Sequence, residues 1–167
     1  MPAASNEPLT IRSAEASDVE GLTEIYVDSA RHHHAIDPAV HQVPDFEGAR
    51  DRIRAKLADP ELEVYVGERN GVIVGLLEMK VVQMGQPGSI MRTIPSAEVG
   101  IAVRDGTRGA GIGTQLMRYA EDWGLEHGCE ATVLDTAASN IGAIRLYQRL
   151  GYEVYGLQMR KPLDPGT

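Results

Sequence analysis

The chain has 167 residues, 43% of them hydrophobic, which suits one domain with a sizeable buried core. Its formal net charge of -8 argues against nonspecific nucleic-acid binding, which needs a basic surface, and its single cysteine excludes an intrachain disulfide. No apolar run approaches the roughly 20 residues of a membrane span, and residues 1–8 lack a secretory signal pattern, so we expect a cytoplasmic protein with no membrane partner.

The first elements that the sequence predicts are a short strand at residues 9–12 and an amphipathic helix at 14–30. In this helix Ser17 is the expected cap, with Glu20 three residues further on. The segment 31–44 follows, and its prolines predict an irregular stretch or a broken helix.

The middle of the chain predicts antiparallel strands. A second helix at 45–58 precedes strands at 63–68 and 72–82, which an Asn-Gly turn joins into a hairpin. Residues 84–95 contain Gly, Pro and Ser and are expected to form a loop or flap. The next predicted strand covers residues 97–103.

The last third predicts a helix at 111–127, a strand at 131–135 and a helix at 139–150, followed by one or two final strands in 152–161. The whole order is βααβββαβαβ. It predicts a mixed α/β fold in which helices flank a mixed, mostly antiparallel sheet. We expect a single domain over residues 1–167 whose ends, 1–8 and 162–167, are loose tails.

A glycine-rich turn joins the strand 97–103 to the following helix and reads Arg108-Gly109-Ala110-Gly111-Ile112-Gly113-Thr114. Glycines let a backbone approach a ligand closely, and the first amides of a helix have no partners within the helix. Because the helix dipole also favours an anion there, the turn predicts a site for a phosphate-bearing ligand. An ordinary strand-to-helix turn is the alternative interpretation.

The spacing of the turn excludes a P-loop and argues against a dinucleotide-binding loop. A P-loop read from Gly106 has Ile112 and Gly113 where its lysine and hydroxyl-bearing residue must stand. The dinucleotide fingerprint requires glycine or alanine at the position of Leu116, and Asp135 lies slightly too far along the chain to serve as its acidic residue. A Rossmann-type nucleotide binder is therefore a weak alternative.

A second motif spans residues 140–152 and reads Asn-Ile-Gly-Ala-Ile-Arg-Leu-Tyr-Gln-Arg-Leu-Gly-Tyr. Its Asn140 and Tyr147 are about two helical turns apart, so they lie on the same face of the predicted helix. Ala143 lies between them, and its small side chain leaves room for a ligand on that face.

Together the two motifs resemble those of the GNAT superfamily of N-acetyltransferases. The turn fits the pattern Gln/Arg-x-x-Gly-x-Gly/Ala, and the second motif fits Asn-x-x-Ala-x-x-Leu/Phe-Tyr-x-x-x-Gly-Phe/Tyr at every specified position. The predicted order of elements also resembles that of the superfamily. Many relatives have a proline and an aromatic residue before the glycines, where this chain has Val103-Arg104-Asp105-Gly106-Thr107. This departure predicts a more flexible loop and a lower affinity for the donor.

The resemblance implies an acyl-CoA donor, with acetyl-CoA as the expected co-substrate, bound where the strands 97–103 and 131–135 splay apart. Amides of the turn would receive the diphosphate, Asn140 would bond the pantetheine arm, and backbone groups of Ile101 and Val103 would pair with it like an added strand. The full set of implied donor-binding residues is Ile101, Ala102, Val103, Arg108, Gly109, Ala110, Gly111, Ile112, Gly113, Thr114, Asn140, Ala143 and Tyr147.

The resemblance also places Tyr147 near the thioester sulfur. Because a phenol with a pKa near 10 carries its proton at neutral pH, Tyr147 is the candidate acid for the departing thiolate. Glu98 is the candidate base that takes a proton from the attacking amine, directly or through a water. A core aromatic residue and a solvated strand carboxylate are the alternative interpretations of these two side chains.

The predicted function is direct transfer of an acetyl group to a primary amine of a small molecule or a peptide. A non-catalytic acyl-CoA-binding regulatory module is the alternative, and Tyr147 favours the enzyme. The identity of the acceptor, the preferred acyl chain and the existence of a homodimer stay open in the sequence.

Two further groups of residues have no assigned role. His32, His33 and His34 would diverge in either a helix or a strand, which argues against a shared metal ion, so we expect them in solvent or lining the acceptor site. The predicted flap contains the apolar residues Met84, Ile90 and Met91. They could line the acceptor site, form a dimer surface or simply pack against the rest of the molecule.

Overall fold

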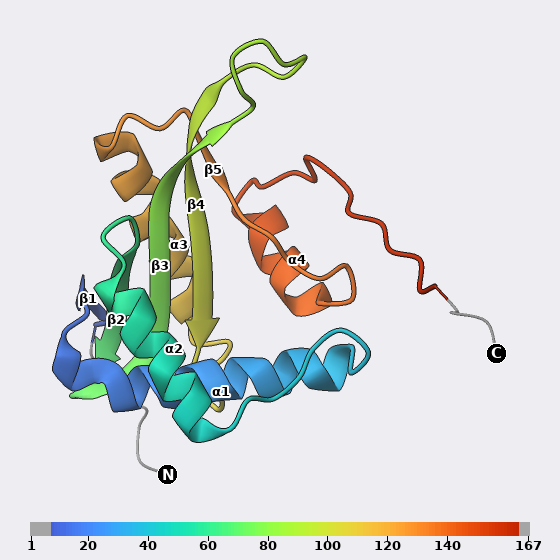
Figure 1. Ribbon diagram of the computed structural model, residues 1–167. Coiled ribbons are helices and arrows are strands. Elements are labelled where there is room, and N and C mark those ends of the chain that lie inside the picture. Colours follow the sequence, from blue (N-terminus) through green and yellow to red (C-terminus); the bar gives the residue numbers. More distant parts are fainter. Residues whose placement is uncertain (1–7, 164–167) are drawn as a thin grey trace.

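The computed structural model describes residues 8–163, and within them five strands form one sheet in the order β1-β2-β3-β4-β5 (Figure 1). Neighbouring strands are antiparallel except β4 and β5, which are parallel. The sheet confirms the predicted fold class. Its strands are β1 (Thr10–Ser13), β2 (Glu63–Arg69), β3 (Val72–Met84), β4 (Ile94–Val103) and β5 (Ala131–Val133). The predicted tails lie outside the described residues, apart from Pro8, Pro162 and Leu163.

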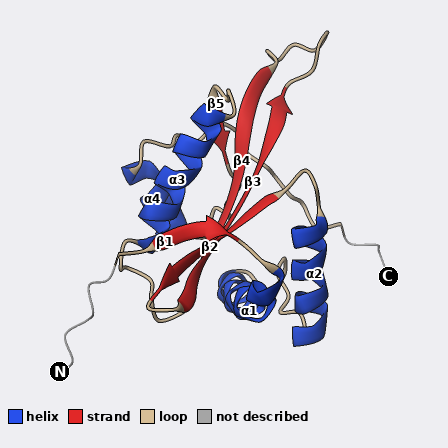
Figure 2. Ribbon diagram, turned by 90° about the vertical axis from the view of Figure 1, so that its left-hand side faces the viewer, coloured by secondary structure: helices blue, strands red, loops and turns tan. Residues whose placement is uncertain are grey.

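Helices cover both faces of the sheet, with α1 and α2 on one side and α3 and α4 on the other (Figure 2). In the part of the chain that the structure describes, none of the helices combines the length and the apolarity that a membrane crossing requires. The helical elements are the short 3-10 helix η1 (Ala16–Asp18), α1 (Val19–Ile36), α2 (Phe46–Ala58), α3 (Ile112–Glu126) and α4 (Ile141–Arg149).

Two apolar clusters fill the space between the sheet and its helices. On one face Leu116 of α3 packs with Leu77 of β3 and Val99 of β4. On the other face Leu22 of α1 packs with Leu76 of β3. Because side chains alternate along a strand, the odd-numbered residues of β4 face α3 and the even-numbered ones face α1. Full burial of each such side chain stabilises the fold by about 1.5–3 kcal/mol.

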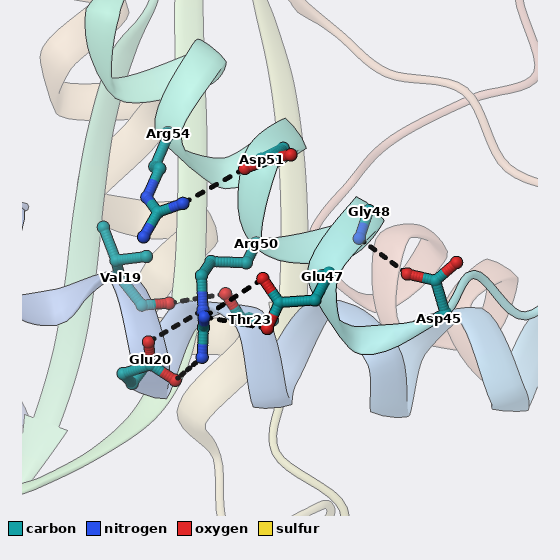
Figure 3. Close-up of polar contacts among 9 residues, drawn as sticks. All are labelled: Val19, Glu20, Thr23, Asp45, Glu47, Gly48, Arg50, Asp51 and Arg54. Carbon is teal, nitrogen blue, oxygen red and sulfur yellow. Dashed lines mark hydrogen bonds and ion pairs between the residues drawn. The ribbon is translucent and has the colours of Figure 1, made fainter.

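Polar contacts fix α2 against α1 (Figure 3). Asp45 caps α2, because its Oδ1 accepts a hydrogen bond of 2.7 Å from the backbone N–H of Gly48. Arg50 of α2 lies 2.9 Å from Glu47 in its own helix and 2.9 Å from Glu20 of α1. Since the carboxylates are exposed, we expect these pairs to orient the two helices more than to stabilise them.

Helix α1 begins and ends later than the sequence predicts. Its start is fixed by Glu15 and Asp18, not by Ser17, because the backbone N–H of Glu15 donates to Asp18 Oδ2 at 2.8 Å. The helix then continues to Ile36, so the irregular stretch predicted from residue 31 is wrong for its first six residues. Pro38 disfavours helix only for itself and the residue before it, and it therefore permits a helix that ends at Ile36.

Three strand boundaries also differ from the prediction. β3 continues to Met84 and pairs there with Ile94, so the predicted loop at 84–95 shortens to the tip of a long hairpin at residues 85–93. β5 ends at Val133 instead of residue 135. The final strands predicted in 152–161 are wrong, because the described residues from Tyr152 onward contain no strand. An alternating pattern forms a strand only where a neighbouring strand supplies backbone partners.

Candidate active site

The sheet opens beside β4. Pairing between β4 and β5 ends at Glu98, which lies opposite Val133, whereas pairing between β4 and β3 continues to Val103. After β5 the chain turns away from β4 toward α4 (Figure 1). Among the described residues β4 therefore has no strand partner on this side beyond Glu98, and the two parallel strands splay as the sequence analysis expects.

The direction of the backbone groups along this edge follows from one hydrogen bond. The N–H of Arg104 donates to the carbonyl oxygen of Val74 at 2.9 Å. In an unbroken antiparallel ladder, backbone groups of every second residue point to the same neighbour, so those of Ala102 face β3. The N–H and C=O groups of Ile101 and Val103 consequently face the opening, where an extended ligand with amide groups can pair with them.

The glycine-rich turn lies at the end of β4. Gly106, Gly109 and Gly111 have positive φ values of 77°, 83° and 77°, which L side chains rarely adopt. A β-carbon added at any of the three would have no neighbour within 4 Å, so the surface over the turn is open. Gly111 is the N-cap of α3, and no side chain caps the helix there. The first amides of α3 are thus available to an anion.

Arg104 anchors the start of the turn. Its Nε donates to the carbonyl oxygen of Ile73 at 2.8 Å, and its guanidinium also contacts Glu24 of α1 at 2.8 Å. The N–H of Asp105 donates to Asp28 of α1 at 3.4 Å. These contacts hold the turn to β3 and α1 in a loop that lacks the proline and the aromatic residue of many relatives. This role of Arg104 was not predicted from the sequence, where the only signal for it is an arginine directly after an apolar strand.

Helix α4 borders the other side of the opening. Asn140 is 7% exposed and caps this helix, with Oδ1 accepting from the N–H of Ala143 at 3.3 Å. A β-carbon on Gly113 would lie 3.1 Å from Cδ2 of Leu146. The glycine therefore allows the first turn of α3 to approach α4 closely, and it links the two motifs of the sequence in space.

Tyr147 lies on α4 and is half-buried against the apolar cluster under α3. Its ring centroid is 5.9 Å from that of Tyr152. Within residues 8–163 its hydroxyl has no hydrogen-bond partner. Burial raises the pKa of this phenol above its usual value, so the hydroxyl keeps its proton at neutral pH. A protonated and unpaired phenol beside the opening has the properties that an acid requires.

Glu98 lies at the point where the two parallel strands separate. As an even-numbered residue of β4 it projects to the face of α1 and α2. Its side chain is 50% exposed and lies 3.5 Å from Lys80 of β3. Glu98 and Tyr147 thus flank the opening from opposite faces of the sheet, and the structure does not bring them together on one face. Ala102 lies on the same face as Glu98, with its backbone directed to β3.

A second carboxylate lies on the same face as Glu98. Glu78 of β3 pairs in register with Gly100 of β4, and its Oε1 accepts a hydrogen bond from Lys56 of α2 at 2.6 Å. A β-carbon on Gly100 would lie 3.6 Å from Glu78 Oε2, so the carboxylate reaches over β4. Glu78 was not predicted as a site residue, although polar residues at alternate positions of an apolar strand are a signal for it.

His32 faces the donor-binding motifs. It is half-buried on α1, with Arg108 and Asp105 of the turn and Asn140 of α4 among its neighbours. Burial, and then the positive charge of Arg108, lower the pKa of its imidazole. His32 is thus a partly exposed residue beside the glycine-rich turn.

The other two histidines of the triplet have contacts of their own. Nδ1 of His33 bonds the carbonyl oxygen of Ser29 at 2.8 Å, and Nδ1 of His34 bonds that of His41 at 2.7 Å. The first bond lies within α1, and the second attaches the chain after α1 to the helix. In the described part of the molecule no group of three or more His, Cys, Asp or Glu side chains is placed to hold a metal ion.

The sequence is similar to those of known N-acetyltransferases. The chain is 29% identical to the aminoalkylphosphonate N-acetyltransferase of Salmonella typhimurium over 119 residues, which are 71% of this chain and 75% of that protein. It is also 29% identical to the L-methionine sulfoximine/L-methionine sulfone acetyltransferase of the same organism over 146 residues, 87% of this chain and 81% of that protein.

The fold also occurs in solved structures. A tetramutant of the BH1408 protein of Bacillus halodurans superposes with a TM-score of 0.84, covers 92% of this chain and 99% of that one, and is 21% identical. The model of the acetyltransferase (GNAT) family matches residues 19–152, which contain the glycine-rich turn, the open edge of β4 and α4. The chain therefore belongs to the acetyltransferase (GNAT) family and is an acetyl-CoA-dependent N-acetyltransferase.

Proposed function

We propose that this enzyme transfers the acetyl group of acetyl-CoA directly to the primary amine of a small molecule. One observation carries the proposal: the unpaired edge of β4 lies between the glycine-rich turn, which suits a diphosphate, and Glu98, which suits an amine. The two relatives are named for small substrates, an aminoalkylphosphonate and methionine sulfoximine or sulfone. A small amine is therefore a better candidate than a peptide.

On the donor side, the proposal uses the backbone more than side chains. The amides from Arg108 to Thr114 receive the diphosphate, and Ile101 and Val103 pair with the amides of the pantetheine arm. The side-chain amide of Asn140 bonds the same arm. The open space over the three positive-φ glycines fits this assignment, because a phosphate can approach their backbone without a side chain in the way.

On the acceptor side, the amine must lose its proton before it attacks, since an ammonium group has no free electron pair. Glu98 takes that proton, directly or through a water. Its position fits this role because the half-exposed carboxylate is accessible from the face of α1 and α2. Glu78 with Lys56 forms the neighbouring wall of that face.

A thioester supplies an acyl carbon and a thiolate leaving group. As the new C–N bond forms and the C–S bond breaks, Tyr147 donates its proton to the thiolate and is reprotonated from solvent. Because a thiol with a pKa near 8.5 is a fair leaving group, this proton contributes only modestly to the rate. No covalent enzyme intermediate is needed.

The test is acetyl-CoA consumption against a panel of amines. The panel contains an aminoalkylphosphonate, methionine sulfone and a short peptide with a free amino terminus, each beside its N-blocked form as the matched control. We expect thiol release and a mass increase of one acetyl group with at least one free small amine and with no blocked compound. Acetylation of the peptide alone would contradict the small acceptor. Tight acetyl-CoA binding without transfer to any amine would support a regulatory module instead.

A further inference from the structure

One side of α1 lies along the glycine-rich turn. Glu24 contacts Arg104 at 2.8 Å, and one helical turn further on Asp28 accepts a hydrogen bond of 3.4 Å from the N–H of Asp105. His32 follows after one more helical turn, because residues four apart lie on the same side of a helix. In Figure 1 α1 passes the end of β4 and ends below α4. Successive helical turns of α1 therefore follow the glycine-rich turn from its start toward its glycines.

His32 lies where the two donor-binding motifs meet. The charged or titratable groups around its imidazole are Arg108 and Asp105 of the glycine-rich turn and His33 of its own helix, and its polar neighbour from α4 is Asn140. The ring centroids of the two histidines are 5.7 Å apart. In the proposed function the diphosphate lies on the glycine-rich turn and the pantetheine arm bonds Asn140. The imidazole thus borders the junction of these two parts of the donor.

Arg108 is the neighbour whose charge affects His32 most. It is exposed, and within residues 8–163 no carboxylate forms an ion pair with it. Asp105 attracts a protonated imidazole, but its effect is the smallest of those that the neighbours exert. Burial and Arg108 lower the pKa of His32, so this ring is neutral in the free enzyme at neutral pH. An anion placed beside both basic side chains would reverse the balance, because it attracts both.

We propose that His32 is a donor-binding residue of α1, and that it takes up a proton from solvent when the diphosphate of the donor binds; this role rests on the proposed donor site at the glycine-rich turn. A protonated imidazole has two N–H donors, whereas a neutral one has a single donor and an acceptor. One N–H donates to an oxygen of the donor and the other to the side-chain oxygen of Asn140. The guanidinium of Arg108 contacts the same diphosphate.

Proton uptake couples the affinity for the donor to pH. Since protonation of His32 is easier in the complex than in the free enzyme, the affinity rises as pH falls through the pKa of the complex and levels off below that of the free enzyme. The 3′-phosphate of CoA acts in the opposite direction, because its second pKa is about 6 and it loses negative charge at low pH. Dephospho-CoA, which lacks this phosphate and keeps the diphosphate, is therefore the better probe.

The first experiment titrates the histidine side chains by NMR, in the free protein and with saturating dephospho-CoA. We expect the pKa of His32 to rise on binding. His34 is the internal control, because it is exposed two residues further along α1 and its pKa should not change. Binding that Gly111→Ala weakens, together with an unchanged pKa of His32, would overturn this role and leave the donor site intact. An absence of binding would overturn both.

The second experiment measures the Kd for dephospho-CoA by calorimetry at pH 7.5 and pH 5.5. Wild type should bind about tenfold more tightly at the lower pH, and His32→Gln, which keeps a polar side chain but cannot take up a proton, should lose most of this gain. The matched control His34→Gln should retain it. At pH 6.5, buffers of different ionisation enthalpy should report proton uptake by wild type and by the control, and less uptake by His32→Gln. Equal uptake by all three proteins would contradict the proposal.

A fragment of the donor tests which part of it His32 recognises. Pantetheine contains the arm and no phosphate, so its binding should cause no proton uptake and should depend little on pH. If pantetheine caused the same uptake as dephospho-CoA, the assignment of His32 to the diphosphate would be wrong.

Discussion

Glu98 and Tyr147 approach the opening beside β4 from opposite faces of the sheet. Glu98 projects to the side of α1 and α2, half-exposed and 3.5 Å from Lys80, whereas Tyr147 packs against the cluster under α3. In the proposed mechanism one residue takes a proton from the acceptor and the other gives a proton to the donor. The two chemical steps therefore predict different kinetic signatures for the two residues.

Replacing Tyr147 by Phe removes the acid and keeps the ring. Because the thiolate is a fair leaving group, we expect kcat to fall by about 10- to 100-fold, at or below the lower end of the roughly 100- to 10,000-fold that acid catalysis contributes. The KM for acetyl-CoA should change little. Steady-state kinetics with an identified amine check both values, and an unchanged kcat would leave Tyr147 as a packing residue.

Replacing Glu98 by Gln should slow the reaction most at neutral pH. Without the base only amine that is already neutral can react, and this fraction rises about tenfold per pH unit below the pKa of the amine. The rate of the variant should therefore climb more steeply with pH than that of the wild type. Lys80→Gln is the control, because it removes the ion-pair partner and keeps the carboxylate. Parallel pH profiles for wild type and Glu98→Gln would exclude the base role.

The glycine-rich turn can be tested with a matched pair of glycines. Gly111 and Gly128 have positive φ values of 77° and 71°, and an added β-carbon meets no neighbour within 4 Å at either position. Alanine should therefore destabilise the fold by a similar amount at both, about 1–2 kcal/mol. In binding titrations only Gly111→Ala should raise the Kd for acetyl-CoA, by about tenfold. Equal affinities of the two variants would argue against donor binding at the turn.

His32 predicts a pH dependence of stability. Burial and Arg108 lower the pKa of its imidazole in the folded protein below the usual value of 6.5. As pH falls through 6.5 the unfolded chain therefore takes up the proton first, and the folded state loses stability. Above that range both states are neutral at this site and the effect disappears. Thermal unfolding between pH 7.5 and 5.5 should show a smaller loss of Tm for His32→Gln than for the wild type, and equal losses would contradict the assignment.

Local patterns made the two motifs in the second half of the chain predictable. The positive φ values of Gly109 and Gly111 and the capping by Asn140 depend on a few neighbouring residues, so the spacing of the two motifs carries the information. The orientation of Ile101 and Val103 toward the opening also follows from strand alternation once β3 and β5 are identified as neighbours. The conformation of the glycine-rich turn, the cap of α4 and the direction of the backbone groups on β4 could therefore be predicted from sequence.

Contacts between distant segments could not be predicted in this way. His32 reaches Arg108 and Asn140 only because α1 continues past residue 30, which depends on how the helix packs beneath the sheet. Arg104 holds the turn through Glu24, 80 residues away in the chain. The absent final strand has the same cause, because the pattern at 155–160 specifies a strand but not its partner.

Amide hydrogen exchange with and without saturating CoA tests the central claim most directly. If the donor pairs with the open edge of β4, exchange at Ile101 and Val103 slows on binding, because their N–H groups face the opening. Exchange at Gly100 and Ala102, whose N–H groups already face β3, changes little. Unchanged exchange at Ile101 and Val103 in a CoA-saturated sample would contradict the account.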